Sequence, residues 1–173
     1  MKPIKFKTKL IQSPGYESGW HFIHVEAKIG TKFEKRDGSR RVVCTINGTE
    51  RFQCALLPWD GKFAIIVNKL KRTRLKIGNG DQITVELALD ESKYGLPMPE
   101  ELEEVLNQDP DGDKLFHSLT AGKQRSVLYF IGKIKDVDRR IHAALIFLEH
   151  LKKNDGKILN KELQSELKRP VSF

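Results

Sequence analysis

The chain has 173 residues, with 31 Lys and Arg against 23 Asp and Glu, which gives a formal net charge of +8. This length fits one domain or two small ones, and 39% hydrophobic with 31% charged residues is typical of a globular protein rather than a disordered or fibrous one. No apolar run approaches the roughly 20 residues of a membrane span, the N-terminus lacks a signal-peptide pattern, and two Cys are too few for a disulfide scaffold, so we expect a cytoplasmic protein.

The first half of the chain shows the two-residue period of β-strands. Apolar side chains alternate with lysines from residue 4 to residue 10, and residues 20–27 are rich in aromatic and β-branched side chains. Asn47-Gly48, a dipeptide well suited to a type I′ turn, predicts a hairpin. Six segments are predicted as strands: residues 4–10, 20–27, 41–46, 50–57, 63–67 and 83–89. Short connections between six strands favour a small barrel, which leaves no exposed sheet edge.

The second half shows the period of helices. Pro99, followed by two glutamates, is typical of a helix start. Residues 109–113 resemble a calcium loop, but Lys114 occupies the position that requires Gly, so we interpret them as a turn with a helix N-cap. Residues 122–134 and 137–152 predict a helical hairpin, with Asp136 as the N-cap of its second helix, and residues 159–168 predict a final helix.

A polar segment with one Gly and two Pro, residues 90–99, suits a linker between two domains. We therefore expect domains at residues 1–94 and 95–173. The first carries 18 basic and 10 acidic residues, whereas the second carries 13 of each, so the charge excess lies in the first. The predicted fold class is α+β, with a small six-stranded barrel followed by an all-α segment.

The strongest functional candidate is a cationic segment of the first half. Residues 69–76 predict a short helix with Asn68 as its N-cap. The segment contains five cations, Lys69, Lys71, Arg72, Arg74 and Lys76. Such a cluster would attract phosphate backbones or an acidic protein surface. A solvated turn is the alternative, because no aromatic side chains that stack on bases are interleaved.

Arg140 is the second candidate. At 100° per residue it falls inside the apolar stripe of its predicted helix, between Phe147 and Leu151. A buried guanidinium needs a carboxylate or carbonyl partner, so Arg140 either anchors the helices or reaches an acidic ligand.

The cysteines and histidines give little evidence of a reactive centre. A two-residue loop at Asn47-Gly48 would pair Cys44 with Arg51 and direct the thiols of Cys44 and Cys54 to opposite faces of the hairpin. Arg51 could then lower the pKa of the Cys44 thiol, although a packing role is the alternative. His142 and His150 are placed on the polar side of their helix. We expect no metal site and no cofactor, because no His or Cys stands at ligand spacing from another.

Short motifs run through both halves in a recognisable order. They are Val67-Asn68-Lys69, Gly80-Asp81, Phe116 and Leu119, Arg125, Ile131, and Arg139-Arg140-Ile141. This order resembles the bacterial YdeI/OmpD-associated family over residues 4–160, in which a small domain of unknown function often precedes the helical domain. The resemblance implies a link to bacteriocin or envelope stress protection, without an accepted enzymatic activity. Asp136-Val137 replaces the usual Thr-Arg pair, so no role of that Arg is carried over.

Two functions follow as hypotheses. The first is a binding or regulatory module, not an enzyme, that recognises a nucleic acid or an acidic protein partner through the five cations of residues 69–76. The second is a small-molecule enzyme or carrier that uses a groove between barrel and helices, with Arg140 or Cys44 as its polar group.

Overall fold

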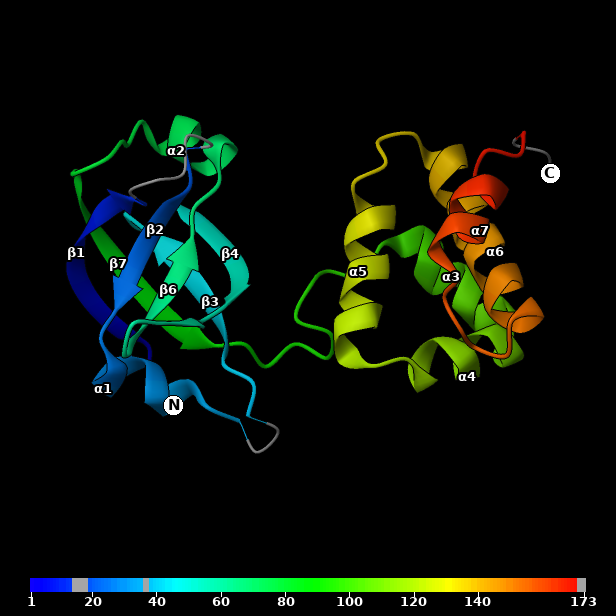
Figure 1. Ribbon diagram of the computed structural model, residues 1–173, viewed down its shortest axis with the longest axis horizontal. Coiled ribbons are helices and arrows are strands. Elements are labelled where there is room, and N and C mark those ends of the chain that lie inside the picture. Colours follow the sequence, from blue (N-terminus) through cyan, green and yellow to red (C-terminus); the bar gives the residue numbers. More distant parts are fainter. Residues whose placement is uncertain (14–18, 36–37, 171–173) are drawn as a thin grey trace. The chain divides into compact units, whose positions relative to one another are not determined.

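The computed structural model describes residues 1–13, 19–35 and 38–170. The chain divides into two compact units, Met1–Glu91 and Ser92–Phe173. The first unit consists mainly of antiparallel strands and the second consists of helices (Figure 1). Each unit has its own hydrophobic core, so each is described by itself.

The N-terminal unit is built on one antiparallel sheet that curls into a barrel-like form (Figure 1). Its order is β4-β3-β7-β1-β2-β6-β5, so the two edge strands follow one another in the chain. Residues 4–9 of β1 pair with β7, and residues 10–12 pair with β2. The strands in the described residues are β1 (Ile4–Gln12), β2 (His21–Val25), β3 (Arg41–Ile46), β4 (Glu50–Ala55), β5 (Leu57–Trp59), β6 (Lys62–Ile66) and β7 (Gln82–Leu89).

The described residues thus contain seven strands where six were predicted. The additional strand is β5, which was expected to be the end of the preceding strand and a turn. Leu56 separates β4 from β5: its side chain is buried, and its N–H donates to the Arg40 carbonyl at 2.8 Å, the last bond in the register of β3 and β4. After that break β5 turns at Asp60-Gly61, where both φ angles are positive, and pairs with β6.

Alternation along the strands separates an inner face from an outer one. The inward side chains pack into one core, and each buried Leu, Ile or Val stabilises the fold by roughly 1.5–3 kcal/mol. Members of this core include Leu10, Ile23, Val25, Val42, Ile46, Ile65, Val85 and Leu87. Three short helices connect the strands: α1 (Ala27–Gly30), η1 (Thr31–Phe33) and α2 (Lys69–Leu75).

The hairpin of β3 and β4 differs from its predicted register by one residue. Asn47 and Gly48 have the positive φ angles of the expected turn, but Ile46 pairs with Glu50 instead of Thr49. Thr49 is left as an extra loop residue. Asn47 explains the shift, because its side-chain oxygen accepts from the Thr84 N–H at 2.9 Å and its own N–H donates to the Thr84 carbonyl at 2.8 Å.

The C-terminal unit contains five helices in the described residues. Asp109, Thr120 and Asp136 cap three of them through their side chains, as the sequence predicts for Asp109 and Asp136. None of the described helices is both long and apolar enough to cross a membrane. The helices are α3 (Glu100–Gln108), α4 (Pro110–Ser118), α5 (Ala121–Gly132), α6 (Val137–Lys153) and α7 (Asn160–Glu166).

The predicted hairpin of the two longest helices is not the main packing unit. The central helix α6 packs mainly against α3 and α4 and touches α5 at few positions. Its buried side chains, among them Ala144, Phe147 and Leu151, join those of the other helices in one core.

His150 lies inside this core, so its predicted place on the polar side of the helix was wrong. Its side chain is fully buried, because α7 and the segment before it cover that face. The Leu159 N–H donates to His150 Nε2 at 3.0 Å, which leaves the ring proton on Nδ1 to bond Glu166 Oε2 at 2.6 Å. One imidazole therefore anchors α7 and the segment before it to α6.

We predict that His150→Ala destabilises the chain by about 1–3 kcal/mol, because the Leu159 N–H and the Glu166 carboxylate lose a buried partner. Urea unfolding of the full chain measures this change. His142→Ala on the same helix is the matched control, since the described residues offer its Nε2 no hydrogen bond. Equal effects of the two substitutions would contradict the anchoring role.

Candidate functional site

Helix α2 carries the cationic segment and begins and ends through specific backbone interactions. Asn68 is its N-cap, as predicted, and accepts a hydrogen bond from the Lys71 N–H at 3.0 Å. Lys76 ends the helix in the left-handed region with a φ of 53°. The helix follows β6 directly, contacts β4 and lies at one end of the barrel-like unit (Figure 1). Lys69, Arg74 and Lys76 are exposed, and Lys71 and Arg72 are partly exposed.

Three of the five cations have contacts within the described residues. The Arg72 guanidinium donates to the Gly19 carbonyl at 3.5 Å, and Lys71 Nζ lies 4.6 Å from the centre of the Phe52 ring. Arg74 forms a loose ion pair with Glu50 at 3.8 Å. This is the one ion pair that the described residues form with the five cations, so within them most of the positive charge of α2 has no acidic partner.

Aromatic side chains that the sequence analysis did not assign to the site lie near this helix. Trp20 follows Gly19, and its ring stacks on Phe22 with centroids 6.4 Å apart. Phe22 stacks in turn on Trp59 at 5.4 Å. The two-residue spacing of Trp20 and Phe22 on a predicted strand was a usable signal for part of this row. Nothing in the sequence indicated that Trp59 joins it, because β5 was not predicted.

Arg140 is engaged within the helical unit. Its guanidinium donates to Glu101 Oε1 at 2.7 Å and to the Ile134 carbonyl at 3.1 Å, so it ties α6 to α3 and to the segment before α6. The hydrogen bond from Arg140 holds the pKa of the Glu101 carboxyl below its ordinary value of 4.5. A carboxylate and a carbonyl are the partners that we expected for a buried Arg140 guanidinium with a structural role.

The geometry of Cys44 contradicts its predicted environment. The observed register pairs Cys44 with Phe52 and Val42 with Cys54, so both thiols are on the inner face of the hairpin. The hydrogen bond with Cys54, together with burial, raises the pKa of the Cys44 thiol, whereas Arg51 was expected to lower it. A buried thiol with a raised pKa is a poor nucleophile.

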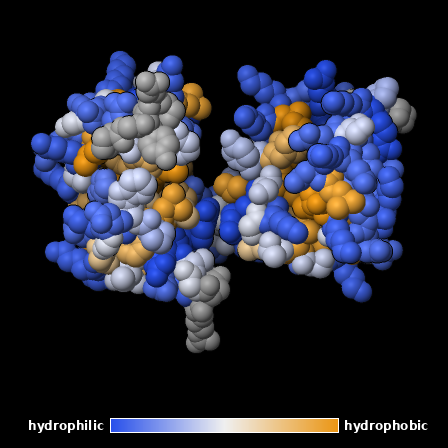
Figure 2. Space-filling model, viewed as in Figure 1, coloured by the Kyte–Doolittle hydropathy of each residue, from blue (hydrophilic) through white to orange (hydrophobic). Residues whose placement is uncertain are grey.

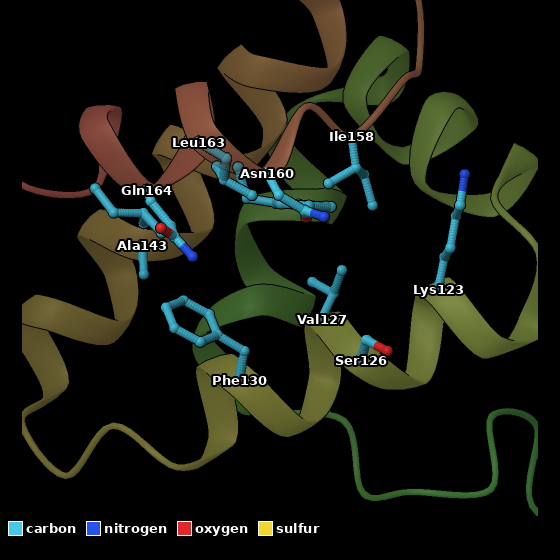
Figure 3. Close-up of a pocket in the computed structure, with 11 residues that line it drawn as sticks. Lys123, Ser126, Val127, Phe130, Ala143, Ile158, Asn160, Leu163 and Gln164 are labelled. Atoms are coloured by element: carbon cyan, nitrogen blue, oxygen red, sulfur yellow. The ribbon is translucent and has the colours of Figure 1, made fainter.

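A pocket of about 400 Å³ lies within the helical unit, between α5, α6 and α7. Figure 3 shows Val127 and Phe130 of α5 facing the segment that carries Leu163 and Gln164. Lys123 and Asn160 add polar groups to the lining, and no thiol, imidazole or carboxylate occurs among its described residues. Figure 2 shows hydrophobic surface on this unit within hydrophilic surroundings. Nowhere in the described chain do three His, Cys, Asp or Glu side chains gather to hold a metal ion.

Family comparison divides the chain in two. Residues 6–87 match a domain of unknown function (DUF1905), and residues 96–154 match the family described as Bacteriocin-protection, YdeI or OmpD-Associated. A comparison with curated proteins found no match. The two matched segments correspond to the strand-rich unit and to most of the helical unit.

We predict that Cys44 reacts slowly with a thiol reagent at pH 8, on the order of a hundredfold more slowly than in urea. Peptide mass spectrometry of the labelled chain separates it from Cys54, which is partly exposed and is the internal comparison. A Cys44 rate close to the rate in urea would contradict the buried, hydrogen-bonded thiol.

A second prediction concerns acid stability. A carboxyl whose pKa is lowered by folding stabilises the protein above its ordinary value of 4.5, and this contribution is lost as the pH falls below it. Arg140→Met should therefore reduce the free energy of unfolding most near pH 7 and progressively less towards pH 3. Urea unfolding at several pH values tests this, with Arg139→Met, an exposed neighbour, as the control. If Arg140→Met lowers the free energy of unfolding by the same amount at every pH, the ion pair between Arg140 and Glu101 is not the cause of the loss.

Proposed function

Because the chain belongs to the YdeI/OmpD-associated family, with a domain of unknown function at its N-terminus, and this description names no reaction, we propose a binding function from its surface chemistry. The chain is a non-enzymatic module that recognises an anionic macromolecule or protein partner in the cytoplasm. Its contact residues are Lys69, Lys71, Arg72, Arg74 and Lys76 of α2.

The observation that carries this proposal is the unneutralised charge of α2. Lys69 and Lys76 are exposed, and among the described residues Arg74 is the one cation of the five with an acidic partner, Glu50 at 3.8 Å. Residues 1–94, which include α2, also hold the whole positive excess of the chain. Cations confined to one surface attract polyanions and make their binding fall steeply with salt.

The family description supplies the biological setting of the proposal. It associates the matched helical segment with bacteriocin protection. We infer that binding by the N-terminal unit serves a protective response to bacteriocin or envelope stress.

The alternative function, a small-molecule enzyme or carrier, has less support. Its polar candidates are already engaged within the described residues, since Arg140 is bonded to Glu101 and Cys44 is buried against Cys54. Lys123 and Ser126 line the pocket of the helical unit, but no histidine or carboxylate stands beside them in its described lining to activate either group.

The proposal predicts salt-dependent retention on immobilised heparin, which is reduced by the double charge reversal Lys69→Glu and Lys76→Glu. Both side chains are exposed, so the substitutions should leave the fold intact. Each reversal changes the charge by two, so the formal net charge falls from +8 to +4. We expect elution at distinctly lower salt and a shallower dependence of affinity on salt.

The matched control is Lys135→Glu with Lys161→Glu, two exposed lysines of the helical unit that produce the same net charge. It should elute close to the unaltered chain. If both double variants shift equally, net charge rather than α2 governs retention. A chain that is not retained at low salt would refute the proposed function.

A further inference from the structure

The outer face of the sheet beside α2 carries an apolar and aromatic patch. Phe22 of β2 lies opposite Ile11 of β1 on one side and Ile66 of β6 on the other. Because their neighbours Leu10, Ile23 and Ile65 point into the core, these three side chains point outward. Ile11 and Ile66 remain 40% and 37% exposed, so the patch is open to solvent.

Two tryptophans form the exposed ends of this patch. Trp20 and Trp59 are 47% and 43% exposed, and Phe22 is held between them at 9%. The rings are nearly parallel, with interplanar angles of 20° for Trp20 and Phe22 and 28° for Phe22 and Trp59. We call Trp20, Phe22 and Trp59 the aromatic row. The exposed parts of the two indole rings are surfaces of the kind on which nucleic acid bases stack.

Cations border the aromatic row at two places. On β1 the exposed Lys5, Lys7 and Lys9 alternate with inward residues and share the outer face with Ile11. Lys7 and Lys9 lie opposite Thr84 and Gln82, which carry no charge, whereas Lys5 lies opposite Glu86.

At the second place, Arg72 of α2 contacts the carbonyl of Gly19, the residue before Trp20. The carboxylate of Glu26, next to the end of β2, is neutralised by Lys62 at 2.9 Å. Arg72 near Trp20 and Lys9 beside Ile11 therefore place positive charge near the aromatic row. Asp60, which directly follows Trp59, is an acidic neighbour.

We propose that this face binds single-stranded nucleic acid. The inference rests on the proposed function and names its ligand class. Phosphates would contact the lysines of β1 and the cations of α2, while unpaired bases would stack on Trp20 and Trp59. An acidic protein surface would use the cations but gain nothing specific from parallel rings. A duplex keeps its bases paired and could not stack on them.

The chain provides its own reporter for this test, because Trp20 and Trp59 are its two tryptophans. Titration of the full chain with a twelve-residue oligothymidylate should quench intrinsic fluorescence as bases stack on the indoles. A heparin fragment, which has no bases, should bind without comparable quenching. Fluorescence anisotropy of a labelled oligothymidylate measures affinity independently.

We expect Trp20→Ala and Trp59→Ala each to weaken oligothymidylate binding by on the order of tenfold, with heparin retention unchanged. Trp59→Phe, which retains a stacking ring, should keep most of the affinity. Tyr129→Ala removes an exposed aromatic ring from the helical unit and should change neither measurement. The phenylalanine variant also separates loss of stacking from loss of folding.

Retention on heparin with unaltered oligothymidylate affinity in both alanine variants would overturn this inference and leave the proposed function standing. If a DNA duplex binds with the same affinity as oligothymidylate, the surface recognises phosphate charge alone. If polyglutamate quenches the fluorescence equally, the surface binds acidic proteins. Either result would overturn the inference. Absence of binding to both heparin and oligothymidylate would refute the proposed function itself.

Discussion

The antiparallel ladder between β1 and β2 is the constraint on which the surface chemistry of the N-terminal unit depends. Leu10 pairs with Ile23, and both are fully buried. Because side chains alternate along a strand, burying these two residues directs Ile11 and Phe22 outward together with the lysines of β1. A slip of one residue would bury lysines and expose the core. The same hydrophobic pattern that folds the sheet therefore also creates a cationic, aromatic outer face.

The two units use their charged residues differently. In the helical unit many acids hold structure together: Asp109 caps α4 and pairs with Lys152, Glu101 binds Arg140, and Glu166 binds His150. In the N-terminal unit α2 begins at an Asn cap, and the described residues form an ion pair with only one of its five cations, Arg74. Charge that is not required for stability is available for binding, which is why we assign the binding function to this unit.

Local patterns predicted much of the fold, and long-range contacts account for the rest. The strand period, the helix period and the caps at Asn68, Asp109 and Asp136 depend on residues close in sequence, so they could be read directly. The register at Thr49 depends on Asn47 binding Thr84 in β7, which no local pattern reveals. The site was predicted in part for the same reason: the cations of α2 are contiguous, whereas Trp59 reaches Phe22 through an unpredicted strand.

The central claim is that the outer face of the N-terminal unit, and not the helical unit, contacts a polyanion. Amide NMR of the uniformly 15N-labelled full chain during titration with oligothymidylate tests this most directly. The account predicts that shifted signals cluster in α2, in β1 and β2, and in the indole N–H groups of Trp20 and Trp59. Shifts confined to α5, α6 and α7, or spread evenly over both units, would contradict it.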